Sequence, residues 1–365
     1  MAIVDQLFFR VIDRGGESVA AGLQDALTER GHDVTCLGFF RDRDDPAPVT
    51  ASWTILAPGE HSAKAAGRAV LALVRRMIRR RPDVVMAHTQ VSSLLGLSLA
   101  WLFRVPRRVA IHHQPHGRDL GWPFWASDAV AGTLGIYTDV VLVSHLSLDA
   151  VERFPARYRD RVRLIPNEVP LPPLPDREEA RAAFGLDADT PVFCFLGAVE
   201  ERKGAAVAAR AVAATGSAVL LLAGRPGDQS DDVAVIGAAT DGRIRPLGHL
   251  TRAEVGQVLA ASDALIFPTR AENRSLTLLE GLSAGLAVVA SDIRGNRDVL
   301  SAGEGTLVAP DDQPGWDAAV AALLDPQRLA DAKAASGRSG RYTAMVDAYE
   351  ATMSGAAVLP SADQA

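Results

Sequence analysis

The sequence is short of the residues that disulfide scaffolds, zinc sites and nucleic-acid binders need. It has two cysteines, Cys36 and Cys194, far apart and each in or beside an apolar run, which indicates two buried thiols in a reducing compartment. Acidic residues outnumber basic ones by 44 to 38, and the net charge of −6 gives no support for a basic domain that neutralises nucleic-acid phosphates. We therefore expect neither a metal site nor a nucleic-acid partner.

Long apolar runs and a leader segment are also missing. The longest apolar stretch, residues 94–103, contains a serine and a glycine, and it is half as long as the roughly 20 residues that a membrane-spanning helix needs. The N-terminus carries Asp5 and lacks the basic segment that opens a signal peptide. These absences predict a cytoplasmic protein.

What the chain does contain is enough apolar sequence for two globular domains. Of its 365 residues 48% are apolar and 22% charged, and domains typically run about 100–200 residues. Lysine is scarce, because Lys64, Lys203 and Lys333 are the only lysines among the 38 basic residues. Each lysine is therefore a mild exception and a candidate for a specific role.

The order of predicted elements is that of a doubly wound α/β sheet. A strand over residues 2–12 is followed by Gly15-Gly16, a helix that ends at Gly31, and a strand over residues 34–40. Helical patterns then alternate with short apolar segments that we expect to be strands, at residues 83–87, 109–111 and 140–143.

A proline-rich segment divides the chain into two such domains. Residues 164–176 contain five prolines in thirteen residues, which excludes a helix or a central strand. Beyond a short helix the alternation restarts, with strands expected at residues 192–196, 219–223, 264–267 and 287–290. We predict an N-terminal Rossmann-like domain (1–166), a linker with a short helix (167–190), a C-terminal Rossmann-like domain (191–354) and a frayed tail (355–365).

The strongest chemical signal is a pair of glutamates around a helix start. Glu272 follows the strand at 264–267, and Glu280 lies about one turn into the helix that opens near Leu276. The amides of Ser275, Leu276 and Thr277 at that helix start favour an anion such as a diphosphate. Carboxylates beside an anion site fit hydrogen bonds from sugar or ribose hydroxyls, the alternative being two solvated glutamates.

A second signal follows the strand at 192–196. Gly197 begins a glycine-bounded loop that ends at Gly204, and Lys203 in this loop offers a mobile charge for phosphate. Arg225, after the next strand, is a further cation at a strand end. The alternative is a solvated lysine in a turn.

Two weaker signals lie in the N-terminal half. Gly15 and Gly16 stand between the first strand and the first helix, where a phosphate loop or a plain tight turn is equally expected. His112 and His113 follow the strand at 109–111, and a histidine there could polarise a sugar hydroxyl or a phosphate oxygen. One of the two is expected to be structural.

Together these motifs resemble glycosyltransferase family four, also described as glycosyl transferases group one. The resemblance is carried by Gly248-His-Leu-Thr-Arg-Ala-Glu-Val, Ala261-Ser-Asp-Ala-Leu-Ile-Phe-Pro-Thr, Glu272-Asn, Glu280-Gly, Ala284-Gly-Leu-Ala-Val-Val-Ala-Ser-Asp and Gly295-Asn, and in the first half by Gly15-Gly16-Glu17, Arg30-Gly-His-Asp-Val and Ile165-Pro-Asn-Glu-Val. It covers nearly the whole chain and is most specific over residues 245–300. It implies a retaining enzyme of the GT-B architecture, with two Rossmann-like domains facing across a cleft.

The resemblance also implies roles for individual residues. Glu272 would contact the donor sugar and Glu280 the ribose of the nucleotide. Lys203 would neutralise the diphosphate, with Gly16 and the amides of residues 275–277. His112 or His113 would lie near the transferred sugar.

The sequence departs from the family pattern at four positions. Ala198 stands where the family usually has an arginine, so Arg202 or Arg225 would have to substitute, or activity would be weak. Asn273 and Ser275 replace common glycines. Glu168 replaces a glycine in the segment between the domains, and Gly281 replaces an alanine.

We therefore expect a metal-independent, retaining glycosyltransferase without a cofactor, which uses a nucleotide-diphosphate sugar, UDP-linked in preference to GDP-linked. The acceptor is not specified, and lipid-linked acceptors are common in the family. One alternative is a degenerate subunit that binds a sugar nucleotide without catalysis, which only Ala198 favours. A dehydrogenase is disfavoured because no Gly-x-Gly-x-x-Gly follows a predicted strand.

The helix over residues 64–81 adds a hypothesis about membranes. Its arginines, Arg68, Arg75, Arg76, Arg79, Arg80 and Arg81, lie opposite an apolar stripe of Val70, Leu73, Val74, Met77 and Ile78. The favoured interpretation is that the stripe packs on the sheet and the arginines are its solvated face. The alternative is weak peripheral contact with an anionic membrane surface.

Overall fold

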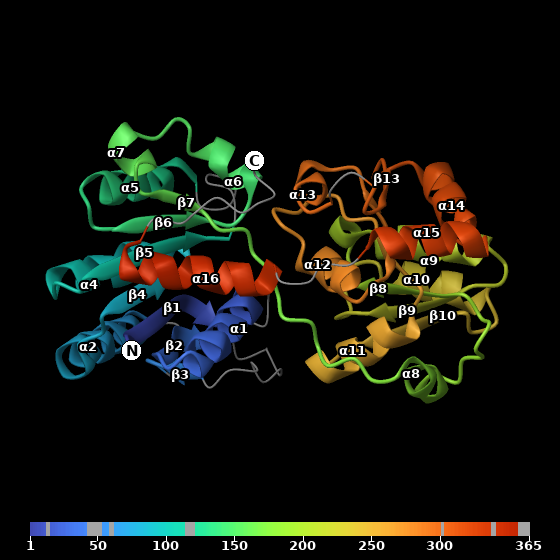
Figure 1. Ribbon diagram of the computed structural model, residues 1–365, viewed down its shortest axis with the longest axis horizontal. Helices are drawn as coiled ribbons and strands as arrows, with labels where there is room; N and C mark the ends of the chain where they lie inside the picture. Colours follow the sequence, from blue (N-terminus) through green and yellow to red (C-terminus); the bar gives the residue numbers. More distant parts are fainter. Residues whose placement is uncertain are drawn as a thin grey trace. The chain divides into compact units, whose positions relative to one another are not determined.

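The computed structural model describes residues 1–11, 15–41, 53–57, 62–113, 121–300, 303–336 and 341–356. The chain forms two compact units, Met1–Val169 together with Gly340–Ala365, and Pro170–Ser339. Each unit is a parallel sheet covered by helices (Figure 1).

The N-terminal unit contains a seven-stranded parallel sheet of order β3-β2-β1-β4-β5-β6-β7. Its strands are β1 (Ile3–Val11), β2 (Asp33–Arg41), β3 (Trp53–Ile55), β4 (Val84–Ala87), β5 (Arg107–His112), β6 (Asp139–Leu142) and β7 (Val162–Leu164). In register, Val4 of β1 pairs with Val34 of β2 on one side and with Val84 of β4 on the other. Strands β4 and β6 are buried along their whole length, as expected of parallel strands covered on both faces.

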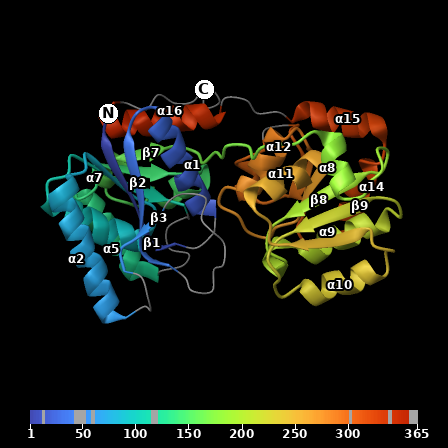
Figure 2. The ribbon, with the colours of Figure 1, turned by 90° about the horizontal axis from the view of Figure 1, so that it is seen from below.

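Two helix layers cover this sheet, as Figure 2 shows. One layer holds α2 (Ala63–Arg80), α3 (Gln90–Ser92), the π-helical turn η1 (Ser93–Leu97), α4 (Ser98–Leu102), α5 (Gly121–Thr133) and α7 (Ala156–Arg159). The members α2, η1, α4, α5 and α7 share one hydrophobic core. The opposite face carries α1 (Gly15–Glu29) and α16 (Arg341–Ser354), while α6 (His145–Ala150) follows β6.

The apolar stripe of α2 packs into the core of its layer, where Leu73 and Met77 are buried. Two of its arginines are tied inward as well. Arg76 donates two hydrogen bonds of 2.8 Å to the buried carboxylate of Asp5, and Arg80 donates one of 2.7 Å to Asp33. The favoured interpretation of this helix therefore agrees with the structure for most of the stripe and for the exposed arginines, but Ile78 is exposed and Arg76 and Arg80 are not part of a fully solvated face.

The last helix requires a correction to the predicted domain boundary. The sequence places residues up to 354 in the C-terminal domain, but α16 packs on the N-terminal unit, beside α1. Arg30 forms ion pairs of 2.7 Å with Asp347 and Glu350, and Tyr349 is buried. Chain order misassigned this helix because an amphipathic helix packs wherever a complementary apolar surface exists.

The C-terminal unit contains a six-stranded parallel sheet of order β10-β9-β8-β11-β12-β13. Its strands are β8 (Val192–Leu196), β9 (Val219–Ala223), β10 (Ile244–Gly248), β11 (Ala264–Phe267), β12 (Ala287–Ser291) and β13 (Thr306–Val308). Its helices are α8 (Arg177–Ala183), the short 3-10 turn η2 (Glu201–Lys203), α9 (Ala205–Ala214), α10 (Ser230–Ala238), α11 (Arg252–Ala261), α12 (Leu276–Ser283), α13 (Arg294–Arg297), α14 (Gln313–Ala322) and α15 (Pro326–Ala335).

Most of the predicted linker belongs to this second unit, which begins at Pro170. The proline-rich segment runs close against α11, since a Cβ built on Gly256 would meet the carbonyl oxygen of Pro173 at 2.1 Å. Glycine is therefore needed there. Helix α8 packs on α11, and Arg177 of α8 forms an ion pair of 2.6 Å with Asp263.

Strand order in both sheets marks where a ligand is expected. The chain reverses its winding between β1 and β4 in the first sheet and between β8 and β11 in the second. Ligands of doubly wound sheets bind outside the carboxyl ends of the strands at such a switch point. The loops that follow these strands are therefore the segments to inspect.

Candidate functional site

The C-terminal unit holds a lysine–glutamate pair at its switch point. Lys203 comes from the turn η2 after β8, and Glu272 from the loop after β11. The Lys203 ammonium donates a 2.5 Å hydrogen bond to Glu272 Oε1, and their side chains are only 18% and 14% exposed. The Thr269 hydroxyl donates a second bond to the same oxygen, at 3.2 Å. Glu272 is therefore hydrogen-bonded and largely buried, and the structure disfavours the alternative of two solvated glutamates.

A glycine permits this approach of the two loops. Gly204, next to Lys203, has a φ of 74°, and a Cβ there would lie 2.2 Å from the carbonyl oxygen of Pro268. Any side chain would push the turn η2 away from the loop after β11. The short loop between β8 and α9 thus fixes the position of Lys203 relative to Glu272.

The N-terminus of α12 lies next to Glu272 in the chain. Ser275 is its N-cap, and its hydroxyl accepts a hydrogen bond of 3.2 Å from the amide of Leu278. The amides of Leu276 and Thr277 precede the first intrahelical bond, from Leu279 to the Ser275 carbonyl. Such amides and the helix dipole make this end attractive to an anion.

Glu280 lies one turn further along α12 and is mostly buried. Arg252 of α11 donates a hydrogen bond of 3.3 Å to its Oε1 and another to the carbonyl of Pro170. Burial raises the pKa of Glu280 above its ordinary value, and the charge of Arg252 opposes that rise. The carboxylate is therefore held in one place with a single charged partner, which leaves it acceptor capacity for hydroxyl groups.

A buried ion pair anchors the loop that carries Glu272. Arg274 and Asp298 are 4% and 6% exposed and lie 3.7 Å apart, and Arg274 also donates to the Asp298 carbonyl at 3.2 Å. The backbone of Gly295, in α13, packs against the Glu272 carbonyl. A Cβ on Gly295 would lie 2.2 Å from that carbonyl oxygen, so glycine is needed there. The loop is thus fixed at both ends.

The remaining predicted residues of this half lie around the pair. Gly197 follows β8 directly, and Gly224 follows β9. The two backbones are in contact there, because a Cβ on Gly224 would lie 1.7 Å from the Gly197 carbonyl oxygen. Arg202 is exposed and lies 3.7 Å from Glu200. Arg225 is half-buried and accepts a backbone bond from Val199, while Asn273 is half-buried beside Glu272.

The N-terminal unit holds a row of polar side chains that crosses four elements of its sheet. Gln6 lies on β1, His88 follows β4, His113 follows β5 and Asn167 follows β7. His88 Nε2 is 2.8 Å from Gln6 Oε1, His88 Nδ1 is 3.0 Å from His113 Nε2, and His113 Nδ1 is 3.2 Å from Asn167 Nδ2. Phe8 stacks on His88 with ring centroids 4.5 Å apart.

This row has one consistent direction of donation. Gln6 Nε2 donates to the carbonyl of Ala20 at 3.1 Å, so its Oε1 accepts from His88 Nε2. His88 Nδ1 then accepts from His113 Nε2, and His113 Nδ1 accepts from the Asn167 amide, which can only donate. Both histidines are therefore neutral and carry their proton on Nε2.

The two predicted histidines have different surroundings. His113 belongs to the row, and a Cβ on Gly16 would lie 3.4 Å from its ring, so the start of α1 covers it. His112 is buried inside the unit with Nε2 3.6 Å from Asp128 Oδ2, and Asp128 also accepts from the hydroxyls of Tyr137 and Tyr158. Successive residues at a strand end point to opposite faces, which separates the pair.

Gly15 and Gly16 require a second correction. The sequence predicts a loop between the first strand and the first helix, whereas both glycines belong to the first turn of α1. Gly15 is exposed and Gly16 lies against His113, as described above.

Acid should destabilise the strands that carry the row. Burial lowers the pKa of His113 to about 4, and burial and the charge of His113 lower the pKa of His88 well below its ordinary value. The unfolded chain therefore binds protons below about pH 6.5 that the folded unit does not. The two neutral histidines therefore contribute fully to the free energy of unfolding above that pH. Below it, the contribution of each histidine falls by about 1.4 kcal/mol for every pH unit, down to about pH 4.

Hydrogen exchange of the β4 and β5 amides near neutral pH and near pH 5 measures this loss as a free energy of opening. The double variant His88→Gln/His113→Gln should lose most of the pH dependence, and His145→Gln, at an exposed position, should retain it. Equal pH dependence in the wild type and the double variant would contradict the assignment of buried neutral histidines.

Several residues that shape the two sites were not singled out from the sequence. His88 follows a strand end as His113 does, and that shared position could have identified it. Gln6 is one polar residue within an apolar strand, which is also a usable signal. Arg252, Arg274 and Asn167 have no comparable signal, because their partners are distant in the sequence.

The described part of the chain contains no group of three or more His, Cys, Asp or Glu side chains that could hold a metal ion. Among the same residues, no helix combines the length and apolar character needed to cross a membrane. Cys36 and Cys194 are both buried and unbridged.

Comparison with known proteins gives two adjacent family matches. Residues 14–171 match the family described as Glycosyltransferase Family 4, and residues 190–326 match Glycosyl transferases group 1. Alpha-maltose-1-phosphate synthase of Mycolicibacterium smegmatis is 28% identical over 263 residues, which cover 66% of this chain and 68% of that protein. Glycogen synthase of Mycobacterium tuberculosis is 27% identical over 357 residues, covering 87% and 84%.

Solved structures with the same fold include Anabaena Alr3699/HepE in complex with UDP-glucose. It matches 97% of this chain and 100% of its own, with a TM-score of 0.75 and 17% sequence identity. A likeness at that identity bears on the fold alone. Together with the two parallel sheets it confirms the predicted fold class, two Rossmann-like domains of the GT-B type.

Proposed function

Because the chain belongs to the family 4 glycosyltransferases, we propose that it transfers a sugar from a nucleoside diphosphate donor to an acceptor with retention of configuration. A UDP-sugar is the favoured donor and a GDP-sugar the alternative. The UDP-glucose complex of Alr3699/HepE, a protein of the same fold, supports this preference.

The observation that carries the proposal is the Lys203–Glu272 pair beside the N-terminus of α12. The loop after β11 and helix α12 supply two carboxylates and the free amides of a helix start. The turn η2, which packs on this loop, supplies the cation. A sugar nucleotide presents the complementary groups, namely a diphosphate and two sets of hydroxyls.

In the proposed reaction the bond between the sugar and the diphosphate breaks, and negative charge develops on the departing phosphate oxygen. Lys203 and the amides of Leu276 and Thr277 would stabilise that charge, which is worth most in a site with little water. Glu272 would turn from Lys203 to the sugar hydroxyls, and Glu280 would accept from the ribose hydroxyls. The acceptor hydroxyl attacks on the face that the leaving group vacates and gives its proton to the departing phosphate oxygen, so no protein nucleophile is required.

The N-terminal row has a different proposed role. Both ring nitrogens of His113 already bind His88 and Asn167, so the neutral ring would offer the sugar its edge and face rather than a charge. His112, which faces Asp128 inside the unit, is then a structural residue. We thus assign the role near the transferred sugar to His113 and not to His112, because of the contacts that each ring makes.

The proposal is tested by screening UDP- and GDP-sugars in thermal unfolding, with purified protein. A donor at about 100 times its dissociation constant should add about 2.7 kcal/mol of stability. Slow hydrolysis of the stabilising donor would support catalysis. Stabilisation without any hydrolysis or transfer would favour the non-catalytic subunit, and no stabilisation by any sugar nucleotide would contradict both.

Glu280→Gln should weaken binding of UDP or GDP by about 10- to 100-fold, as expected for lost hydrogen bonds to a charged group. The fold should remain intact, because burial already disfavours the Glu280 charge, and among the residues that the structure describes its side-chain partner is Arg252. Calorimetric titration of wild type and variant gives the affinity ratio. Glu254→Gln, at the exposed capping box of α11, is the matched control. Equal affinity in wild type and Glu280→Gln would remove the ribose assignment.

A further inference from the structure

Helix α5 has an apolar outer surface that the fold of the N-terminal unit does not use. Trp122 and Val130 of α5, and Leu134 just beyond its end, are 75%, 57% and 71% exposed. The helix has a single charged residue, Asp128, which is buried and bound to two tyrosine hydroxyls. A surface helix usually carries polar residues on this side.

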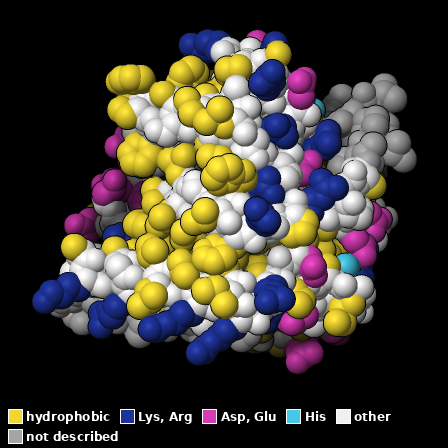
Figure 3. Space-filling model, turned by 90° about the vertical axis from the view of Figure 1, so that its left-hand side faces the viewer, with side chains coloured by type: hydrophobic (Ala, Val, Ile, Leu, Met, Phe, Trp, Pro, Cys, Tyr) yellow, Lys and Arg dark blue, Asp and Glu magenta, His cyan; other side chains and the backbone are white. Residues whose placement is uncertain are grey.

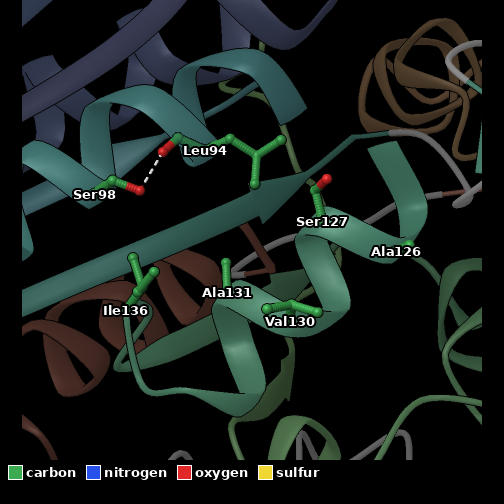
Figure 4. Close-up of a pocket in the computed structure, with 7 residues that line it drawn as sticks. All are labelled: Leu94, Ser98, Ala126, Ser127, Val130, Ala131 and Ile136. Carbon is green, nitrogen blue, oxygen red and sulfur yellow. Dashed lines mark hydrogen bonds between the residues drawn. The ribbon is translucent and has the colours of Figure 1, made fainter. Parts of the chain in front are cut away.

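The end of α4 continues the apolar surface. Trp101 and Leu102 are 52% and 65% exposed, and Phe103 follows them at the surface. Between the two helices runs a groove of about 370 Å³, lined by Leu94, Ser98, Ala126, Ser127, Val130, Ala131 and Ile136. Figure 4 shows Leu94 and Ser98 on one helix opposite Ala131 of α5 and Ile136. We call α4, α5 and this groove the apolar face.

Arginines border the apolar face on both sides. Residues 151–163, which include α7, contain five arginines and two acids, and α2 contains six basic residues and no acid. Figure 1 places α4 and α5 between α7 and α2. The exposed members are Arg153, Arg157 and Arg159 on one side and Lys64, Arg68, Arg75 and Arg79 on the other. Figure 3 shows hydrophobic side chains gathered over this face, with Lys and Arg along its lower edge and to the right.

We propose that the apolar face docks on an anionic phospholipid bilayer. Tryptophan and leucine insert at the level of the headgroups, and arginines on both sides bind phosphates of the same surface. Each basic residue near such a surface adds about fivefold to binding at low salt. The proposal moves the membrane contact from α2, which the sequence suggested, to α4 and α5, and leaves α2 as one basic border.

Charge argues against a second copy of the chain as the occupant. Dimers related by a two-fold axis bring the same patch of both subunits together. The borders of this patch carry an excess of one sign, so such a dimer would bring arginines toward arginines, which disfavours association. A bilayer with anionic headgroups is complementary to the apolar centre and to both borders.

Co-sedimentation tests the proposal with vesicles of phosphatidylcholine alone and of phosphatidylcholine mixed with phosphatidylglycerol. The wild type should bind the mixed vesicles at low salt and be released near 1 M salt, where the Debye length is about 3 Å. Trp101→Ser/Leu134→Ser should reduce binding by about tenfold or more. Val235→Ser on α10, also highly exposed and apolar, should bind as the wild type does.

The arginines are tested separately with Arg153→Gln/Arg157→Gln/Arg159→Gln, which should weaken binding to the mixed vesicles and reduce its salt dependence. Thermal unfolding of each variant checks that these exposed substitutions leave the fold intact. Absence of binding to mixed vesicles overturns the proposal, as does equal binding by Trp101→Ser/Leu134→Ser. A concentration-dependent dimer in sedimentation velocity that this double variant abolishes would assign the face to a second copy instead. None of these measurements depends on catalysis.

Discussion

Replacing Lys203 by alanine should lower turnover at saturating donor by at least about 100-fold. That is the scale on which removal of one preorganised electrostatic stabiliser acts. The Lys203 ammonium lies 2.5 Å from Glu272 Oε1 and 5.7 Å from the centre of the Phe267 ring, so it is already positioned at the switch point, and only Glu272 has to turn away when a diphosphate takes its place. Initial rates with excess donor and acceptor, once both are identified, measure the effect.

Two further variants make the test specific. Lys203→Arg should recover only part of the turnover, because a planar guanidinium does not reproduce a compact ammonium charge. Lys64→Ala, an exposed lysine at the start of α2, should leave turnover unchanged. Near-wild-type turnover in Lys203→Ala would transfer the diphosphate contact to another cation, with half-buried Arg225 the first to examine and exposed Arg202 the next.

The sequence predicted best those features that depend on residues close together in the chain. Alternation of short apolar strands and helices predicted the central strands of both sheets but missed the edge strands β3, β7, β10 and β13. The segment from Glu272 to Glu280 predicted the α12 site, because a strand, a loop and a helix start are all local patterns. The Lys203–Glu272 contact joins residues far apart in sequence, but both follow strands that pair in the sheet, β8 and β11. Sheet topology therefore made that contact predictable in principle.

Features that depend on distant surfaces were not predictable in the same way. Chain order placed residues 341–354 in the C-terminal domain, and only the packing of α16 against the N-terminal unit shows that they belong to the other one. The apolar side of α5 has no strong amphipathic pattern, so its exposure appears only once the helix is placed. His112 and His113 have the same sequence context, and they differ because a strand directs neighbouring side chains to opposite faces.

Arg274→Met should destabilise the C-terminal unit by up to about 3–5 kcal/mol, because it removes the charged partner that the buried Asp298 carboxylate has in Arg274. Arg274 and Asp298 are 4% and 6% exposed, so water cannot readily solvate the remaining carboxylate. Because the pair joins the Glu272 loop to the end of α13, the variant should also weaken binding of the donor. A 5-fluorotryptophan resonance of Trp316, which is buried in the core of this unit, follows its unfolding in urea.

An exposed pair nearby supplies the control for this measurement. Arg297 and Asp292 approach to 2.5 Å but are 63% and 33% exposed, so Arg297→Met should change stability little. Arg274→Met/Asp298→Asn should regain part of the stability, because the buried carboxylate charge is then gone, while the Glu272 loop still lacks its anchor and donor binding stays weak. If Arg274→Met were as stable as Arg297→Met, the buried pair would not hold the loop, and the placement of Glu272 would have to rest on Thr269 and Lys203 alone.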